Sequence, residues 1–124
     1  MGKAKPKPKS PFTGRWRIDS MSAWEDESLD EEVQAFFEFE ETGRGSLHGS
    51  FQFGYIRGLM DCRTTSRGGE PAVEFSWEGV DGADGTPLTG RGWAILRGDE
   101  LSGLFCIHEG DESVFEATRA TSHD

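Results

Sequence analysis

Hydrophobic and polar residues alternate with a period of two along most of this chain, and glycine-rich breaks separate the alternating runs. Such alternation is typical of β-strands with one buried face, because successive side chains of a strand point to opposite sides of the sheet. No stretch has the 3.6-residue period of an amphipathic helix, and 17 glycines disfavour long helices. The pattern predicts eight strands, over residues 12–18, 33–40, 46–53, 55–65, 72–78, 88–97, 101–108 and 113–119.

Short connections between these runs determine the predicted architecture. Strands joined by short loops pair with their neighbours in antiparallel fashion, and eight of them close into a barrel that leaves no unpaired edge. The fold class is therefore predicted to be all-β, an eight-stranded antiparallel up-and-down barrel, with a two-sheet β-sandwich as the alternative. Gly54 is either a tight turn or a kink in one long strand. The clearest loops are expected at residues 65–71, 79–87, 98–99 and 110–111.

The interior of the predicted barrel is crowded and aromatic. If Trp16 points inward, the alternation sends residues of the same parity inward with it. A barrel of eight strands is either filled by its own side chains or holds one small ligand, and the aromatic residues favour filling. The expected inward set is Phe12, Gly14, Trp16, Ile18, Val33, Ala35, Phe37, Phe39, Leu47, Phe51, Phe53, Val73, Phe75, Trp77, Phe105, Ile107, Phe115 and Ala117.

Gly14-Arg15-Trp16 on the first strand and Arg119 at the end of the last strand resemble the calycin group of barrels, which includes lipocalins, fatty-acid-binding proteins and avidins. In that group a cation on the last strand packs over the tryptophan, so the resemblance implies that Gly14, Trp16 and Arg119 form a structural signature. It covers residues 12–119 and is closest to a short, avidin-sized member. The avidin-type ligand set has no residue-by-residue counterpart here, so no ligand is carried over.

Three runs, at residues 12–18, 72–77 and 90–94, are similar to those of a family of small bacterial proteins of unassigned function. This second resemblance implies a bacterial protein with a calycin-like barrel. It supplies no activity.

The charge of the chain limits its partners. The formal net charge is −10, which disfavours binding to nucleic acid and to anionic lipid. No apolar run approaches the ~20 residues of a membrane-spanning helix. The basic N-terminus lacks the apolar stretch of a secretory signal. We therefore expect a soluble, cytoplasmic protein with no nucleic-acid or membrane partner.

Charge and proline content also divide the chain into segments. Every lysine lies in the first ten residues, spaced by glycine, alanine and proline, which form neither a helix nor a core. Residues 1–10 are predicted to be a disordered arm, residues 11–120 a single β-barrel domain, and residues 121–124 a disordered tail. The acidic run at 25–32 is expected to be a solvated connector in which Trp24 and Leu29 tether a short helical turn to the barrel.

The outer face of the sixth and seventh strands carries a candidate interface. If Phe105 points inward, then Leu104 and Cys106 point outward, and Trp93 and Ile95 lie beside them. An apolar patch with an arginine rim is typical of protein–protein interfaces, and avidin-type barrels associate through such faces. The opposite phase, with Trp93 and Ile95 inside, is the alternative. We expect a homo-oligomer, most simply a dimer, through Arg91, Trp93, Ile95 and Leu104.

Residues that could carry chemistry are few. His48 and His108 could meet at the barrel rim with Asp61 or Glu109 as an acid–base site, or they could be surface histidines. Cys62 and Cys106 are expected to be free, buried thiols. Spacings typical of zinc, calcium or phosphate sites and of a serine nucleophile are absent, so no metal or cofactor is expected.

These observations lead to a functional expectation. The sequence predicts a non-enzymatic barrel that acts by protein–protein association or by binding a small apolar ligand, with an opening near Trp24 in the second case. The alternative is an enzyme with a histidine–carboxylate site at the rim of the barrel.

Overall fold

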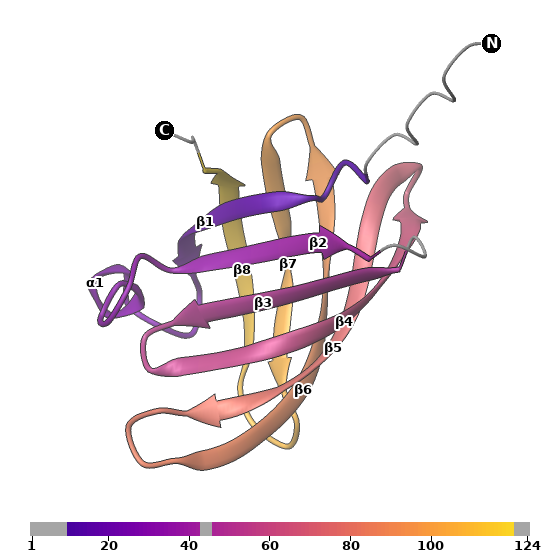
Figure 1. The fold of residues 1–124 in the computed structure, drawn as a ribbon. Coiled ribbons are helices and arrows are strands. Elements are labelled where there is room, and N and C mark those ends of the chain that lie inside the picture. Colours follow the sequence, from indigo (N-terminus) through magenta and orange to yellow (C-terminus); the bar gives the residue numbers. More distant parts are fainter. Residues whose placement is uncertain (1–9, 43–45, 121–124) are drawn as a thin grey trace, which may run out of the picture.

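The eight strands of the chain form one closed antiparallel barrel in chain order, β1-β2-β3-β4-β5-β6-β7-β8 (Figure 1). The computed structural model describes residues 10–42 and 46–120. The predicted fold class is thus confirmed, and the sandwich alternative is wrong. Except for Ser10, the predicted arm and tail lie outside the described residues. The strands are β1 (Gly14–Met21), β2 (Phe36–Glu41), β3 (Leu47–Phe53), β4 (Ile56–Arg67), β5 (Glu70–Asp81), β6 (Thr86–Arg97), β7 (Glu100–Ile107) and β8 (Glu112–Arg119).

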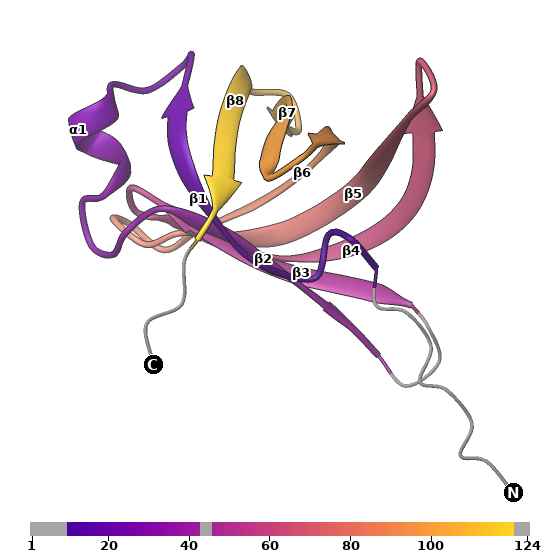
Figure 2. The same ribbon diagram turned by 90° about the horizontal axis from the view of Figure 1, so that it is seen from above.

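The β4–β5 hairpin is longer than its sequence suggests and extends away from the rest of the barrel (Figure 2). The loop expected at 65–71 is wrong, because pairing continues to Arg67 opposite Glu70 and leaves a two-residue turn at Gly68 and Gly69. Both glycines have a positive φ, as the tightest hairpin turns require. The loop expected at 79–87 is likewise reduced to residues 82–85. Main-chain pairing continues through these exposed polar residues because ladder hydrogen bonds need no apolar side chain.

The connection between β1 and β2 closes one end of the barrel. It contains the short helix α1 (Asp26–Leu29), whose Leu29 is buried and accepts a hydrogen bond from the Gly54 N–H (2.7 Å). The Trp24 ring lies 4.8 Å from that of Phe53, so the predicted tether is confirmed. Gly54 itself is a tight turn between Phe53 and Ile56. Within the described residues, no helix is both long enough and apolar enough to span a membrane.

Val33 is not part of the interior, contrary to expectation. It is 42% exposed and lies outside β2, which begins at Phe36. A carboxylate oxygen of Asp30 accepts the Ala35 N–H (2.8 Å), and the Ala35 carbonyl accepts the Ile18 N–H (3.0 Å). These bonds hold the chain in a bend before the strand, so the alternation seen in the sequence has no structural meaning at Val33.

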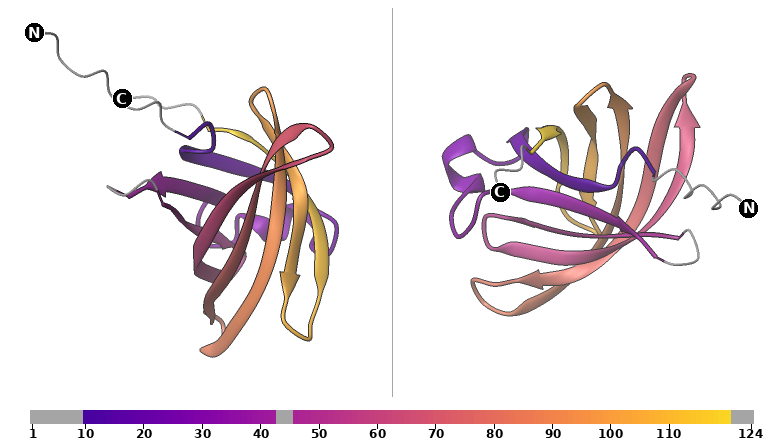
Figure 3. Two further views of the ribbon diagram at one scale, coloured as in Figure 1. Left: turned by 90° about the vertical axis from the view of Figure 1, so that its right-hand side faces the viewer. Right: turned by 45° about the horizontal axis from the view of Figure 1, so that its top comes forward.

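Aromatic side chains pack against one another in the interior, which the strands surround in both views of Figure 3. The rings of Phe37 and Phe115 lie 4.8 Å apart, between β2 and β8. The ring of Phe105 lies 5.0 Å from Trp77 and 5.1 Å from Phe53. Rings at these separations are in direct contact. Further buried members that the sequence analysis did not include are Met21, Leu29, Met60, Ala94, Leu96 and Leu101.

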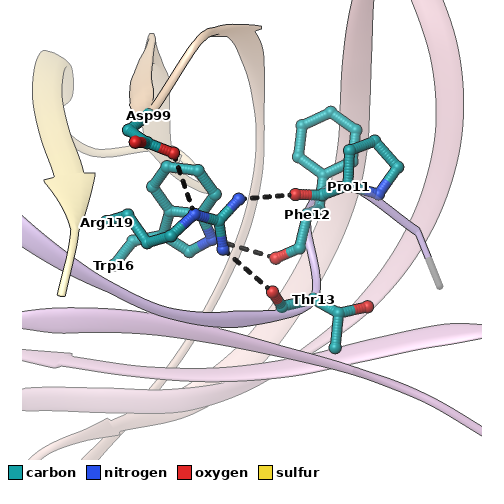
Figure 4. Close-up of polar contacts among 6 residues, drawn as sticks. All are labelled: Pro11, Phe12, Thr13, Trp16, Asp99 and Arg119. Atoms are coloured by element: carbon teal, nitrogen blue, oxygen red, sulfur yellow. Dashed lines mark hydrogen bonds and ion pairs between the residues drawn. The ribbon is translucent and has the colours of Figure 1, made fainter. Parts of the chain in front are cut away.

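The seam between β1 and β8 is secured by Trp16 and Arg119, which are paired across the two strands (Figure 4). Trp16 is fully buried, and its indole N–H donates to the Phe12 carbonyl (2.9 Å). The Arg119 guanidinium carbon lies 4.1 Å from the centre of the Trp16 ring. This is the packing that the calycin resemblance implies.

Hydrogen bonds hold Arg119 in this position. Its guanidinium donates to the main-chain carbonyls of Pro11 (2.9 Å) and Thr13 (3.1 Å) and to the Asp99 carboxylate (3.2 Å). Gly14 has a φ of 118°, which favours glycine two residues before the tryptophan, and a Cβ atom there would lie 3.3 Å from the same guanidinium.

Candidate functional site

The outer surface of β6, β7 and β8 brings three residues of each strand into three cross-strand rows. Ala94 and Leu96 are buried inside the barrel, which places Trp93 and Ile95 on the outer face of β6. We call this surface the β6–β8 face. Its rows are Arg91–Cys106–Glu112, Trp93–Leu104–Val114 and Ile95–Ser102–Glu116.

The middle row of the β6–β8 face is apolar. Trp93 and Leu104 are half-buried and Val114 is 57% exposed. The Arg67 guanidinium carbon lies 4.0 Å from the centre of the Trp93 ring, so one face of the indole is already covered by a cation. Large apolar side chains next to one another on an outer sheet surface are a common feature of binding sites.

Val114, which belongs to the middle row, and Arg67, which contacts it, were not among the predicted site residues, and neither were Glu112 and Glu116 on β8. Val114 could have been found, because an inward Phe115 places its neighbour outside. Arg67 could not, because its position was predicted to be a loop. It reaches Trp93 only because the β4–β5 hairpin continues as far as Arg67.

Charged residues flank the apolar row, with different signs on different strands. The basic residue of the first row, Arg91, is on β6, whereas Glu112 and Glu116 are on β8. Arg91 and Glu112 form no ion pair with any residue in the described part of the chain. The main chains of β6 and β8 are about 10 Å apart, with β7 between them. Arg91 and Glu112 are therefore each available to a partner.

A groove of about 440 Å³ extends from this face across β5 to β4. Arg63, Arg67 and Arg91 line it together with Trp93, and Glu74 and Asp61 supply opposite charge. In the described part of the chain none of these three arginines has an ion pair, in contrast to Arg15, Arg17, Arg97 and Arg119. Arginines that form no ion pair within the described residues therefore border the apolar row on its β4 side.

The four predicted rim residues do not form one cluster. His48 and Asp61 are paired on the outer face of β3 and β4. His108 and Glu109 lie in the turn after β7, where Glu109 has a φ of 57°. Strands β5 and β6 separate the two pairs. The described residues also contain no group of three side chains that could hold a metal ion.

The opening of the barrel lies at the end opposite the one that the sequence suggested. The end near Trp24 is closed by α1. At the other end a hollow of about 710 Å³ is lined by Phe12, Leu47, Cys62 and Thr64, among others. Charged and apolar groups are mixed in the lining of this hollow, which lies at the mouth of the barrel.

Both cysteines are free, and their surroundings disfavour the thiolate form. Cys106 is buried as expected, whereas Cys62 is only partly so. Burial, and secondarily the negative charge of Asp61, raises the pKa of the Cys62 thiol to about 12. The pKa of Cys106 is also raised, by burial and then by Glu112, although Arg91 acts in the opposite direction. Both thiols therefore stay protonated at neutral pH.

The raised pKa predicts slow alkylation of Cys62. At pH 8 the native protein with Cys106→Ser should react with iodoacetamide about a thousandfold more slowly than the same chain in guanidinium, because only the thiolate reacts. Mass spectrometry of samples taken over time measures both rates. Equal rates would contradict the prediction, and a rate in native protein that rises tenfold per pH unit above pH 9 would support it.

Comparison with protein-family models, with curated proteins and with solved structures finds no match to this chain. The calycin resemblance is thus supported at the level of the eight-stranded antiparallel barrel. The more specific resemblance to small bacterial proteins stays a prediction.

Proposed function

We propose that this protein is a non-enzymatic barrel that acts by associating with a second copy of itself through the β6–β8 face. The observation that carries the proposal is the position of Trp93, Leu104 and Val114. They form a continuous apolar row on the outside of the barrel, although many aromatic residues are buried inside it.

The composition of the face supports association. Tryptophan and arginine are the residues most enriched among those that dominate binding energy, and here Arg67 stacks on Trp93 at the edge of the row. Leu104 lies at the centre of the face, and charged residues of both signs surround it. An apolar centre with a polar rim is the usual organisation of an interface. The proposal places the protein in the cytoplasm, where two free thiols stay reduced.

Binding of a small apolar ligand is the second candidate, supported by the hollow at the mouth. Phe12 and Leu47 give it an apolar floor, but Glu41 and Arg63 also line it. A carrier of apolar ligands usually encloses most of the ligand surface. The close ring contacts of Phe105 with Trp77 and Phe53 restrict such a ligand to the mouth.

Replacement of Trp93 by glutamate tests the proposal. We expect the wild type to be a dimer by size-exclusion chromatography with light scattering, and Trp93→Glu to be a folded monomer. A charge placed in the apolar row would have to be buried without a partner, which weakens binding by about a hundredfold or more. Circular dichroism confirms that the variant is folded.

Leu59→Glu is the matched control. Leu59 is 68% exposed on the outer surface of β4, away from the β6–β8 face, so its replacement should leave the dimer intact. A wild type that stays monomeric at high concentration would contradict the proposal and favour the hollow at the mouth. A Trp93→Glu variant that stays dimeric would show that another surface is used.

A further inference from the structure

The signs of the charges on the β6–β8 face are arranged by strand. On the outer surface, β6 presents Arg91 beside the apolar row, and β8 presents Glu112 and Glu116 on either side of it. Strand β7, which lies between them, contributes uncharged side chains to all three rows, namely Cys106, Leu104 and Ser102. The face thus has a basic edge and an acidic edge separated by about 10 Å.

Two such faces can pack about a two-fold axis in two ways that keep the strands aligned. With the axis parallel to β7, strand β6 of one copy lies over strand β8 of the other, and residues of the same row face each other. Arg91 then faces the partner's Glu112, and Trp93 faces the partner's Val114. With the axis across the strands, Glu112 faces the partner's Glu116, so two like charges oppose each other.

We propose that the dimer forms about a two-fold axis parallel to β7, in which each copy's Arg91 pairs with the partner's Glu112 and Trp93 packs on the partner's Val114. This inference rests on the proposed self-association and adds the relative orientation of the two copies. Leu104, at the centre of the middle row, lies against its own counterpart. The two ion pairs between Arg91 and Glu112 are related by the two-fold axis, so the first and middle rows of one copy are complementary to those of the other.

The contacts within one copy leave these groups free for the dimer. Neither Arg91 nor Glu112 is ion-paired within the described part of the chain. Glu116, in contrast, accepts a hydrogen bond from Ser102 of its own chain (3.2 Å), which holds its carboxylate beside β7. The apolar row supplies the affinity, whereas the charged pairs set the orientation of the copies, because charges at a rim affect specificity more than affinity.

Charge reversal of the two positions tests the orientation. Arg91→Glu and Glu112→Arg each place like charges opposite each other twice, so each variant alone should bind itself about a hundredfold more weakly than the wild type. In an equal mixture of the two variants, each new charge faces its opposite in a mixed dimer. We expect native mass spectrometry to show that mixed dimer, and the double variant Arg91→Glu/Glu112→Arg to dimerise on its own.

The outcomes separate the orientation from the proposed function. Glu78→Arg, on the outer surface of β5, is the control and should leave the dimer unchanged. If Glu112→Arg alone strengthened the dimer, the axis across the strands would be correct, because the new charge would face the partner's Glu116. If Trp93→Glu gave a monomer but the mixture of Arg91→Glu and Glu112→Arg formed no mixed dimer, the β6–β8 face would still be the interface. The proposed orientation of the two copies would then be wrong. A monomeric wild type would overturn both.

Discussion

Replacement of Trp16 by alanine is expected to lower the free energy of unfolding by about 3–5 kcal/mol, the range typical of a large aromatic residue removed from a core. Trp16 is fully buried and lies at the seam that closes the barrel. Its loss removes the ring under the Arg119 guanidinium and the hydrogen bond to the Phe12 carbonyl. The cavity that remains would lie beneath a cation that has lost its stacking partner.

Thermal unfolding followed by circular dichroism measures this effect. For a chain of this size the midpoint should fall by about 10–20 °C. Trp16→Phe is the informative control, since it keeps an aromatic ring under Arg119 but loses the indole N–H, and it should cost less than half as much. A change of less than about 1 kcal/mol for Trp16→Ala would show that the β1–β8 seam does not depend on this residue.

The second large effect is expected at Gly103, where even one methyl group should prevent the native pairing of β6 and β7. A Cβ atom at this position would overlap the Trp93 carbonyl oxygen and would lie 2.8 Å from the Ala94 Cα. Both are main-chain atoms of β6, so neither can move aside without separating the two strands. We expect Gly103→Ala to cost about 5 kcal/mol or more, which exceeds most single substitutions.

Urea denaturation measures the loss in the free energy of unfolding for Gly103→Ala, with Gly110→Ala as the control. A Cβ atom at Gly110 would lie 3.1 Å from the Cγ2 atom of Ile107. A shift of a few tenths of an ångström relieves that contact, so the substitution should cost about 1 kcal/mol or less. Similar midpoints for the two variants would mean that β6 and β7 can shift apart at little cost. Because β6 and β7 also carry the middle of the β6–β8 face, Gly103→Ala should lose self-association together with the fold.

These predictions distinguish residues that hold the barrel together from residues that would bind a partner. Trp16 and Gly103 act within one chain. Trp93, Arg91 and Glu112 lie on the outer surface, and their substitution should change association while the barrel stays folded. A set of variants that weakened both properties in parallel would mean that the barrel is stable only as a dimer.

Much of the fold could be predicted from local patterns alone. The period-two alternation predicted the number of strands and the inward direction of Phe37, Phe51 and Phe115, because the direction of a side chain in a strand depends only on its parity. The order of the strands was predicted from their short connections. Gly14, Trp16 and Arg119 were also identified from the sequence, through a resemblance. Local patterns were misleading where the chain leaves the sheet, as at Val33, and where pairing continues through polar residues, as in the β4–β5 hairpin.

Only the tertiary structure decided which residues lie beside one another across strands. It placed Val114 next to Leu104 and Arg67 over Trp93, and it separated His48 from His108 by three intervening strands. The physical reason is that alternation is a property of each strand by itself, whereas register depends on how all eight strands twist, tilt and close around one core. A row of side chains across β6, β7 and β8 therefore exists only once the barrel has closed.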